Sequence, residues 1–253
     1  MDVLIFGGQS NMCGTTSEFP KDIFELADCY EYRFNENKLI PLKHPCGENI
    51  GEELESATNG NGCLIPSFVR AYKLTRNSKV VAVHAAKGRT MLCHWKQGTK
   101  RYDVAKNKIL AAIDNANEYE KIEHIYYIWL QGESDATHKT SKNDYYNDLI
   151  VYKNDLKKDI GIEKFGIIKV GYFSKEDEFD YAIQQAQEKC AKDDSDFLML
   201  TRVCEFLSKN QYYMNPLHNG HYDNEALNII GSCAGECLGR YAINEINKGE
   251  DYD

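Results

Sequence analysis

The sequence contains no long hydrophobic run. None of its apolar stretches approaches the roughly 20 residues that a membrane-spanning helix needs. The first of them, Val3–Phe6, is too short for the apolar part of a secretion signal, and no basic residues precede it. We therefore expect a cytoplasmic protein without a membrane partner.

An excess of positive charge is also missing. Lysine and arginine together number 30 against 39 aspartates and glutamates, which gives a formal net charge of −9. The basic residues are scattered, so nothing would offset the repulsion from nucleic-acid phosphates or from an anionic membrane. We therefore expect no nucleic-acid partner; the sequence does not indicate the oligomeric state.

The familiar motifs of metal and nucleotide sites are absent as well. There is no Gly-x-Gly-x-x-Gly, no P-loop and no His-Glu-x-x-His. The nine cysteines are odd in number and include no Cys-x-x-Cys, so we interpret them as reduced thiols. Most of the histidines show no ligand spacing either: His44, His84, His94, His124 and His138. We predict no metal site and no organic cofactor.

What the sequence does contain is an alternation of strands and helices. Short runs rich in valine and isoleucine predict strands at Val3–Phe6, Lys79–Ala85, Ile125–Leu130, Gly166–Phe173 and Phe197–Val203. Amphipathic segments predict helices at Val104–Asn117, Asn143–Lys158, Phe179–Lys192 and Asn224–Asn247. Such an alternation is typical of a parallel sheet covered on both faces. We predict one α/β domain over residues 1–253, a three-layer α/β/α sandwich with a central, mainly parallel five-stranded sheet.

One segment departs from this alternation. Residues 13–62 are polar and turn-rich, and they show no long period of either type. We interpret them as a long loop excursion over the carboxyl edge of the sheet, where loops that contact substrate are usually found.

A serine follows the first predicted strand directly. The strand ends in Gly7-Gly8, which permits a tight turn, and Ser10 comes two residues later. Open α/β sheets bind their ligands at the carboxyl ends of the strands. Ser10 is therefore our candidate nucleophile.

Three later positions offer the groups that a nucleophilic serine needs. Gly88 and Gln131 follow the second and third predicted strands, and His221 precedes the last helix. A histidine can take the serine proton, and preorganised N–H donors can hold the oxyanion of an acyl transfer. Together with the Ser10 N–H, the Gly88 N–H and the Gln131 amide would form an oxyanion hole.

At this point the sequence resembles a known family, the sialate O-acetylesterase and acetylxylan esterase branch of the SGNH hydrolases, carbohydrate esterase family six. The motifs that carry the resemblance are Gly8-Gln9-Ser10-Asn11-Met12, Ala86-Lys87-Gly88-Arg89-Thr90 with Trp95, Gln131-Gly132-Glu133-Ser134-Asp135, and His221-Tyr222. The resemblance implies a flavodoxin-like sandwich and a serine esterase that removes acetyl groups from a carbohydrate without a cofactor. By the resemblance, Ser10 is the nucleophile and His221 the general base, and the oxyanion hole is the one just described.

One position departs from the family pattern. The family usually has an aspartate three residues before its histidine, and this chain has His218 there. Three alternatives remain open: Glu133 orients His221, a Ser10–His221 dyad works with a backbone carbonyl or water, or the enzyme is impaired. We favour Glu133 as the third catalytic residue.

The substrate-binding residues are expected around the same motifs. We place Gln9, Arg89, Trp95 and His218 there, with the Trp95 ring stacking on a sugar and the Arg89 charge favouring a polar or acidic one. Two other functions remain possible. One is a broader SGNH lipase or thioesterase, and the other is a carbohydrate-binding protein without activity.

Overall fold

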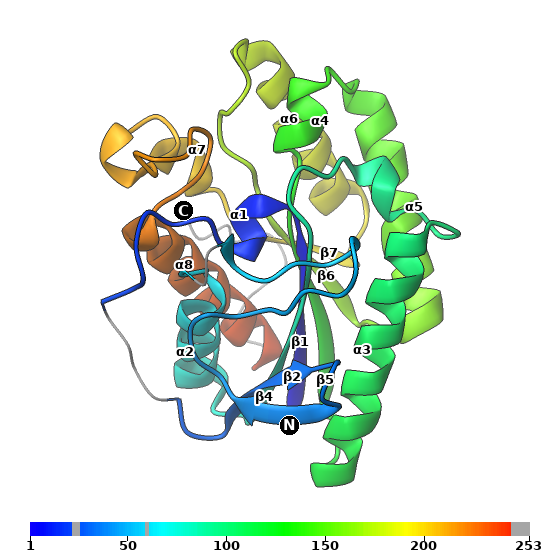
Figure 1. Ribbon diagram of the computed structural model, residues 1–253. Coiled ribbons are helices and arrows are strands. Elements are labelled where there is room, and N and C mark those ends of the chain that lie inside the picture. The colour runs from blue at the N-terminus through cyan, green and yellow to red at the C-terminus, as the bar shows by residue number, and fades with distance from the viewer. Residues whose placement is uncertain (22–25, 59–60, 244–253) are drawn as a thin grey trace.

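The protein is a three-layer sandwich with a seven-stranded sheet in the middle (Figure 1). The computed structural model describes residues 1–21, 26–58 and 61–243. The strand order is β3-β2-β4-β1-β5-β6-β7, and only β3 runs antiparallel to its neighbour. The strands are β1 (Asp2–Gly8), β2 (Cys29–Arg33), β3 (Lys38–Pro41), β4 (Val80–Ala86), β5 (His124–Leu130), β6 (Lys164–Ile168) and β7 (Phe197–Thr201).

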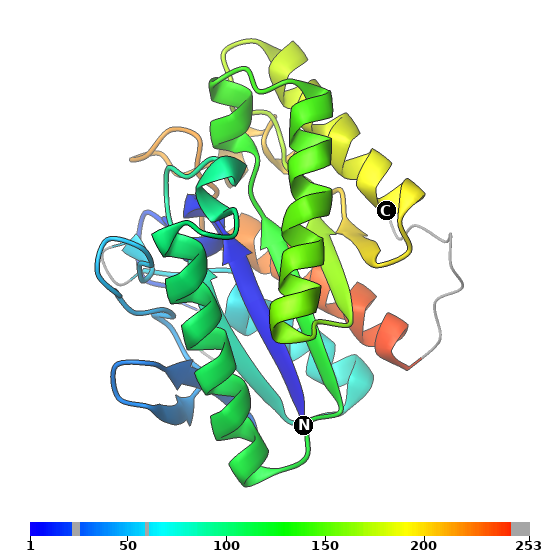
Figure 2. The ribbon, with the colours of Figure 1, turned by 90° about the vertical axis from the view of Figure 1, so that its right-hand side faces the viewer.

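The two faces of the sheet are covered by different helices. Figure 2 shows α3 (Lys100–Tyr119) and α5 (Lys142–Ile160) in front of the sheet, with α2 (Ile65–Arg76) and α8 (Asn224–Ala242) behind it. Successive side chains of β1 and β5 point to opposite faces. The Phe6 ring accordingly packs edge-on against Phe68 of α2, and the Tyr127 ring packs against Tyr152 of α5. The remaining long helix, α6 (Asp177–Asp193), packs against α5 and β7.

Helices α2 and α8 approach each other very closely. Glycines on α8 make this possible, because a Cβ at Gly231 would overlap the Ser67 hydroxyl and one at Gly235 would overlap the Phe68 carbonyl oxygen. The close packing fixes the start of α8, which directly follows the segment that contains His221.

The predicted sandwich is confirmed, but the sheet has seven strands rather than five. The two extra strands, β2 and β3, lie within the 13–62 excursion, and α2 follows it without having been predicted. The pattern of β2 is concealed because it buries a charge: Glu31 is 1% exposed and pairs with Arg33 at 3.0 Å. The predicted end of the last helix, beyond residue 243, lies outside the described residues.

The remaining elements are short and lie at the ends of the sheet strands or beside α8. They are α1 (Ser10–Cys13), η2 (Leu92–Trp95), α4 (Glu133–Thr137), α7 (Cys204–Leu207) and η3 (Gln211–Tyr213). Among the described residues, no helix is both long and apolar enough to cross a bilayer.

The sheet brings the predicted site segments to one edge. Gly8, at the end of β1, is in register with Ala86 of β4 and with Leu130 of β5. Since the three strands are parallel, the segments that follow them open at the same carboxyl edge. Counting only β4, β1, β5, β6 and β7, the order is that of the flavodoxin-like sheet, and its switch point lies between β1 and β5.

Candidate functional site

Ser10 stands at the first position of α1, directly after the turn that ends β1. Gly8 adopts a φ of 144°, and a Cβ there would overlap the carbonyl oxygen of Leu130. The Gln9 N–H donates to that same carbonyl at 3.1 Å, so the turn is fixed to β5. The Ser10 N–H begins a helix and has no partner within it, which leaves it available as a donor.

The structure brings Ser10 and His221 together across most of the chain. The Nε2 atom of His221 lies 2.9 Å from the Ser10 hydroxyl oxygen. The Nδ1 atom lies 3.0 Å from the carbonyl oxygen of Asn219 and 3.3 Å from that of His218. Because carbonyl oxygens only accept hydrogen bonds, Nδ1 carries the proton. The lone pair of Nε2 therefore faces the serine, as a general base requires.

Burial keeps this imidazole neutral. It lowers the pKa of His221, while the carbonyls of His218 and Asn219 act in the opposite direction and the nearby charge of Arg89 lowers it further. A neutral ring is the form that can take a proton from serine.

The loop that carries His221 is anchored on both sides of the histidine. The His221 carbonyl accepts the Asn215 N–H at 2.8 Å. Tyr222 is fully buried, and its hydroxyl donates to the Cys204 carbonyl at 3.1 Å. The imidazole is thus positioned by backbone bonds and by the buried neighbour that follows it.

The predicted contact between Glu133 and His221 is not formed. The Glu133 carboxylate accepts the Asn11 amide at 2.7 Å, and its other oxygen is buried with no hydrogen-bond partner among the described residues. Burial raises the pKa of Glu133 to about 7, with the Asn11 bond opposing the shift and the charges of Asp180 and Asp135 adding to it. The reason is directional: Glu133 begins α4, and its side chain turns inward rather than over the rim.

Glu133 nevertheless reaches the histidine loop indirectly, through Asn11. The Asn11 amide also lies 3.4 Å from the Gly220 carbonyl, and its side-chain oxygen accepts the Tyr222 N–H at 3.2 Å. Asn11 therefore contacts the residues on either side of His221 and is held by Glu133. It was missed because only the neighbouring serine stood out in the motif.

Gly88 lies beside Ser10, as predicted. A Cβ at Gly88 would come within 3.5 Å of the Ser10 Cβ. Its N–H, however, donates to the Glu55 carboxylate at 2.6 Å, and the other Glu55 oxygen pairs with Lys87 at 2.9 Å. Glu55 comes from the loop excursion and was not predicted. Its carboxylate occupies one of the donors expected to hold an oxyanion.

The Gln131 side chain does not take the predicted place in an oxyanion hole. It is fully buried, and its amide donates to the Thr90 carbonyl at 2.9 Å and to Asp135 at 2.5 Å. Its side-chain oxygen accepts from Tyr145 at 3.0 Å. These bonds use both amide hydrogens, so Gln131 links the segments after β4 and β5 instead of facing Ser10.

The side-chain amide of Gln9 is a candidate donor instead of the Gln131 amide. The Gln9 side-chain oxygen accepts the Ser134 N–H at 3.1 Å and is 3.4 Å from the Gln131 amide. Because the Ser134 N–H can only donate, the Gln9 oxygen faces it and the Gln9 amide nitrogen points the other way. Within residues 1–21, 26–58 and 61–243, that nitrogen has no hydrogen-bond partner. Gln9 immediately precedes Ser10 and therefore lies beside the nucleophile.

Of the other residues predicted to contact the substrate, one is buried and two are exposed. Trp95 is fully buried, donates to the Thr90 hydroxyl at 3.0 Å and packs edge-on against Trp129, so it cannot stack on a sugar. Arg89 and His218 are exposed at the rim, and the His218 ring lies 6.5 Å from that of His221. Arg89 has a φ of 58°, in the left-handed region that favours glycine.

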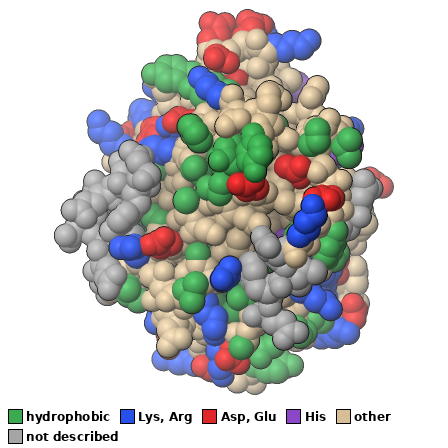
Figure 3. All heavy atoms as spheres, turned by 90° about the vertical axis from the view of Figure 1, so that its left-hand side faces the viewer, with side chains coloured by type: hydrophobic (Ala, Val, Ile, Leu, Met, Phe, Trp, Pro, Cys, Tyr) green, Lys and Arg blue, Asp and Glu red, His purple; other side chains and the backbone are tan. Residues whose placement is uncertain are grey.

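Exposed apolar side chains lie on the segment that leads to the histidine loop. Phe206, Tyr212 and Leu217 are 67%, 70% and 68% exposed. Figure 3 looks onto the side of the molecule where α7 and α8 lie and shows hydrophobic side chains gathered on the upper half of that face. This segment has the exposed aromatic surface that Trp95 lacks.

A group that could hold a metal exists, but it contains none of the residues just described. Among the described residues it consists of His44, Cys46 and Cys63. The Ser10 edge itself offers a hydroxyl, a neutral imidazole and N–H donors.

The chain resembles known proteins both in a family model and in its fold. The family model for carbohydrate esterases described as sialic acid-specific acetylesterases matches residues 1–215. No curated protein sequence matches the chain. A structure of an Arabidopsis thaliana protein is similar with a TM-score of 0.67 and 15% identity, covering 96% of this chain and 98% of that one.

Two further solved structures share the fold. A carbohydrate acetylesterase from Xanthomonas citri has a TM-score of 0.54 and 15% identity over 96% of this chain, which spans 56% of that protein. A lipase/acylhydrolase from Enterococcus faecalis has a TM-score of 0.52 and 9% identity, covering 99% of this chain and all of that one. At these identities the structures show a common fold.

Proposed function

Because the chain belongs to the family of carbohydrate esterases described as sialic acid-specific acetylesterases, we propose that it removes O-acetyl groups from a carbohydrate with Ser10 as nucleophile. The observation that carries the proposal is the 2.9 Å contact between the Ser10 hydroxyl and the unprotonated Nε2 of His221. That is hydrogen-bond distance from a general base to the proton it must take.

The proposed reaction has two halves. Ser10 attacks the acetyl carbonyl while its proton passes to Nε2 of His221. The bond from the acetyl carbon to the sugar oxygen then breaks, and Nε2 returns the proton to that oxygen. A water attacks the acetyl-enzyme in the same way, and acetate leaves as the Ser10 oxygen recovers its proton.

The base works as a dyad in this proposal. The carbonyls of Asn219 and His218 keep the proton on Nδ1, which preserves the correct tautomer throughout the reaction. They supply partial rather than full negative charge to the imidazolium that forms. The missing carboxylate therefore lowers the rate without removing the mechanism.

Three donors are proposed for the oxyanion. They are the N–H groups of Ser10 and Gly88 and the side-chain amide of Gln9. Each adds no charge and is held by the turns that follow β1 and β4, as a preorganised site requires. The Gly88 N–H becomes available when the acyl oxygen displaces the Glu55 carboxylate.

Hydrolysis of 4-nitrophenyl acetate and of an acetylated xylo-oligosaccharide tests the proposal. Ser10→Ala should lower kcat roughly 10,000-fold or more. Ser232→Ala, on the exposed side of α8, is the matched control and should retain full activity. His221→Ala should lose activity and His218→Ala should keep it.

Three results would point elsewhere. Equal activity of the Ser10→Ala and Ser232→Ala proteins would exclude Ser10 as nucleophile. No activity of the parent protein on any acetyl ester, with binding of the sugar retained, would identify a carbohydrate-binding protein. Faster hydrolysis of long-chain esters than of sugar acetates would favour the lipase alternative.

A further inference from the structure

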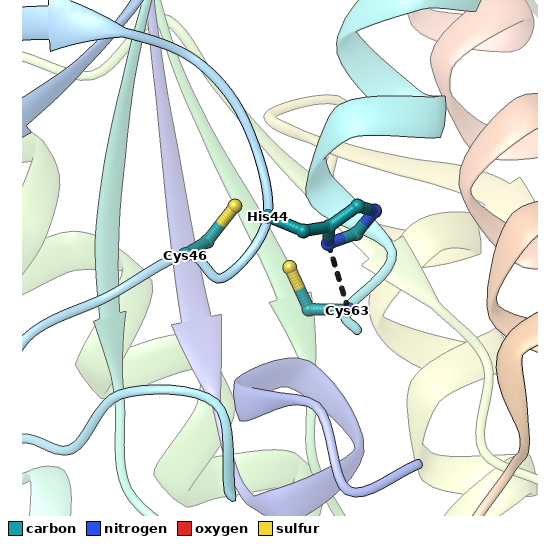
Figure 4. A group of neighbouring side chains, drawn as sticks. All are labelled: His44, Cys46 and Cys63. Carbon is teal, nitrogen blue, oxygen red and sulfur yellow. Dashed lines mark hydrogen bonds between the residues drawn. The ribbon is translucent and has the colours of Figure 1, made fainter. Parts of the chain in front are cut away.

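Three side chains that can bind a metal meet in the interior, close to the end of α1. His44 and Cys46 lie in the loop after β3, and Cys63 lies just before α2. One ligand atom from each lies within 4.8 Å of the other two. Figure 4 shows the two thiols and the imidazole turned toward the same space.

The three residues are nearly or fully withdrawn from solvent. His44 is 8% exposed, Cys46 is fully buried and Cys63 is 2% exposed. Two hydrogen bonds join them to the backbone. The Cys63 N–H lies 3.4 Å from Nδ1 of His44, and the Cys46 sulfur lies 3.6 Å from the Lys43 carbonyl oxygen.

A fourth buried polar group lies beside the loop. His84 is 1% exposed, and both of its ring nitrogens are without a hydrogen-bond partner in the part of the chain that is described. Gly47, which follows Cys46, sits against it: a Cβ at Gly47 would be 3.0 Å from Nδ1 of His84. The imidazole of His84 thus adds a free polar group next to the cluster.

The donor set selects the metal. Two thiolates and an imidazole suit zinc and copper(I), and they do not suit magnesium or calcium, which prefer oxygen ligands. Two thiolates also cancel the charge of a divalent ion, so a zinc complex would be neutral in this buried place, whereas a copper(I) complex would carry a net charge. Charge balance therefore favours zinc.

Zinc binds cysteine as the thiolate, so binding at this site would release the protons of Cys46 and Cys63. The affinity for zinc should therefore rise with pH.

We propose that His44, Cys46 and Cys63 bind one zinc ion, with a small exogenous ligand in the fourth position. The ion would join the loop after β3 to the start of α2. The ion would also fix the end of α1, the short helix that Ser10 begins. Gly14, which ends that helix, packs so closely against Cys63 that a Cβ at Gly14 would come within 2.6 Å of the Cys63 Cβ. The sequence analysis did not consider this group because His44 and Cys46 lie far from Cys63 along the chain.

The amount of zinc bound per chain tests the proposal independently of esterase activity. The full chain is purified under reducing conditions, treated with chelator, incubated with zinc chloride and freed of excess ion. We expect one zinc per chain for the parent protein and for the Cys29→Ser control, whose thiol is buried elsewhere. Cys46→Ser and Cys63→Ser should each lose it.

Two further measurements on the parent protein test the proposal even if the cysteine variants fail to fold. Cobalt(II) in the chelator-treated parent protein should give a tetrahedral visible spectrum with thiolate-to-cobalt charge transfer, and added zinc should raise its Tm. The proposal is overturned if the parent retains no zinc, or if Cys46 and Cys63 form a disulfide that persists under reducing conditions.

Discussion

The backbone N–H of Gly88 donates a hydrogen bond to the carboxylate of Glu55 at 2.6 Å, next to the nucleophile. An acyl oxygen approaching Ser10 must compete with this carboxylate for the N–H. Hydrogen bonds to charged groups contribute about 1.5–3 kcal/mol, so the competition costs roughly tenfold to hundredfold in affinity for the transition state.

Removing the Glu55 carboxylate should therefore accelerate the reaction. We expect Glu55→Ala to raise kcat/KM for 4-nitrophenyl acetate about tenfold. The control is Glu52→Ala, an exposed glutamate of the same excursion. A lower kcat/KM in Glu55→Ala would contradict this reasoning and would mean that Glu55 chiefly holds Lys87 and Gly88 in place.

The Glu133 carboxylate should make the stability of the protein depend on pH. Its pKa is raised to about 7 in the folded protein, against about 4.5 when exposed. A raised carboxyl pKa leaves folding unpenalised below pH 4.5, and the penalty grows between pH 4.5 and pH 7 and is constant above that. Relative to the parent, Glu133→Gln should gain up to ~3 kcal/mol of unfolding free energy between pH 4.5 and pH 8.

Urea unfolding at a series of pH values measures that difference. Glu118→Gln, an exposed residue near the end of α3, is the control and should show no such trend. A constant difference between Glu133→Gln and the parent would show that Glu133 is not the buried acid described here. Because the glutamine can still accept from Asn11, its kcat should change little.

The core of the site was predictable because it depends on local sequence. A strand that ends in Gly7-Gly8 places Ser10 at the carboxyl edge whatever surrounds it. Parallel neighbours then bring Gly88 to the same edge, and His221 reaches it from the segment before the last helix. Strand ends and short turns fix backbone positions, and backbone positions are what these predictions used.

Side-chain direction and burial could not be read in this way. Gln9 and Gln131 are both amides at the right edge, yet only the fold decides that Gln131 is fully buried and bonded to Asp135. Strand β2 was missed because Glu31 is buried in it, paired with Arg33, in a position where a pattern search expects an apolar residue. Both errors arise from contacts between segments far apart in sequence.

Arg89 adopts a backbone conformation that glycine tolerates better. A φ of 58° costs a residue with a Cβ about 1 kcal/mol in the folded state. Replacing it with glycine removes this cost, but part of the gain is lost because glycine makes the unfolded chain more flexible. We expect Arg89→Gly to raise the free energy of unfolding by ~0.5–1 kcal/mol. Arg89→Ala, which removes the charge and keeps the Cβ, separates the two effects in urea unfolding. An equal gain in both variants would assign the effect to charge.

His221 lacks a carboxylate partner, and this sets its pH dependence. Burial lowers its pKa below the usual value near 6.5, so the acidic limb of kcat/KM should fall below pH 6.5. A carboxylate at the position that the family normally uses should reverse this, because an opposite charge within about 4–6 Å favours the imidazolium. We expect His218→Asp to move the limb to higher pH and to raise kcat about tenfold.

The neutral variant His218→Asn is the matched control, because it has nearly the same shape as the aspartate and no charge. Both variants keep the backbone carbonyl that accepts from Nδ1, so only the charge differs between them. A pH profile of kcat/KM from pH 4.5 to pH 8.5 compares the two proteins. Identical profiles would mean that a side chain at position 218 cannot reach the imidazole. In that case the exposed loop, rather than the missing charge, makes this enzyme depend on backbone carbonyls to hold its base.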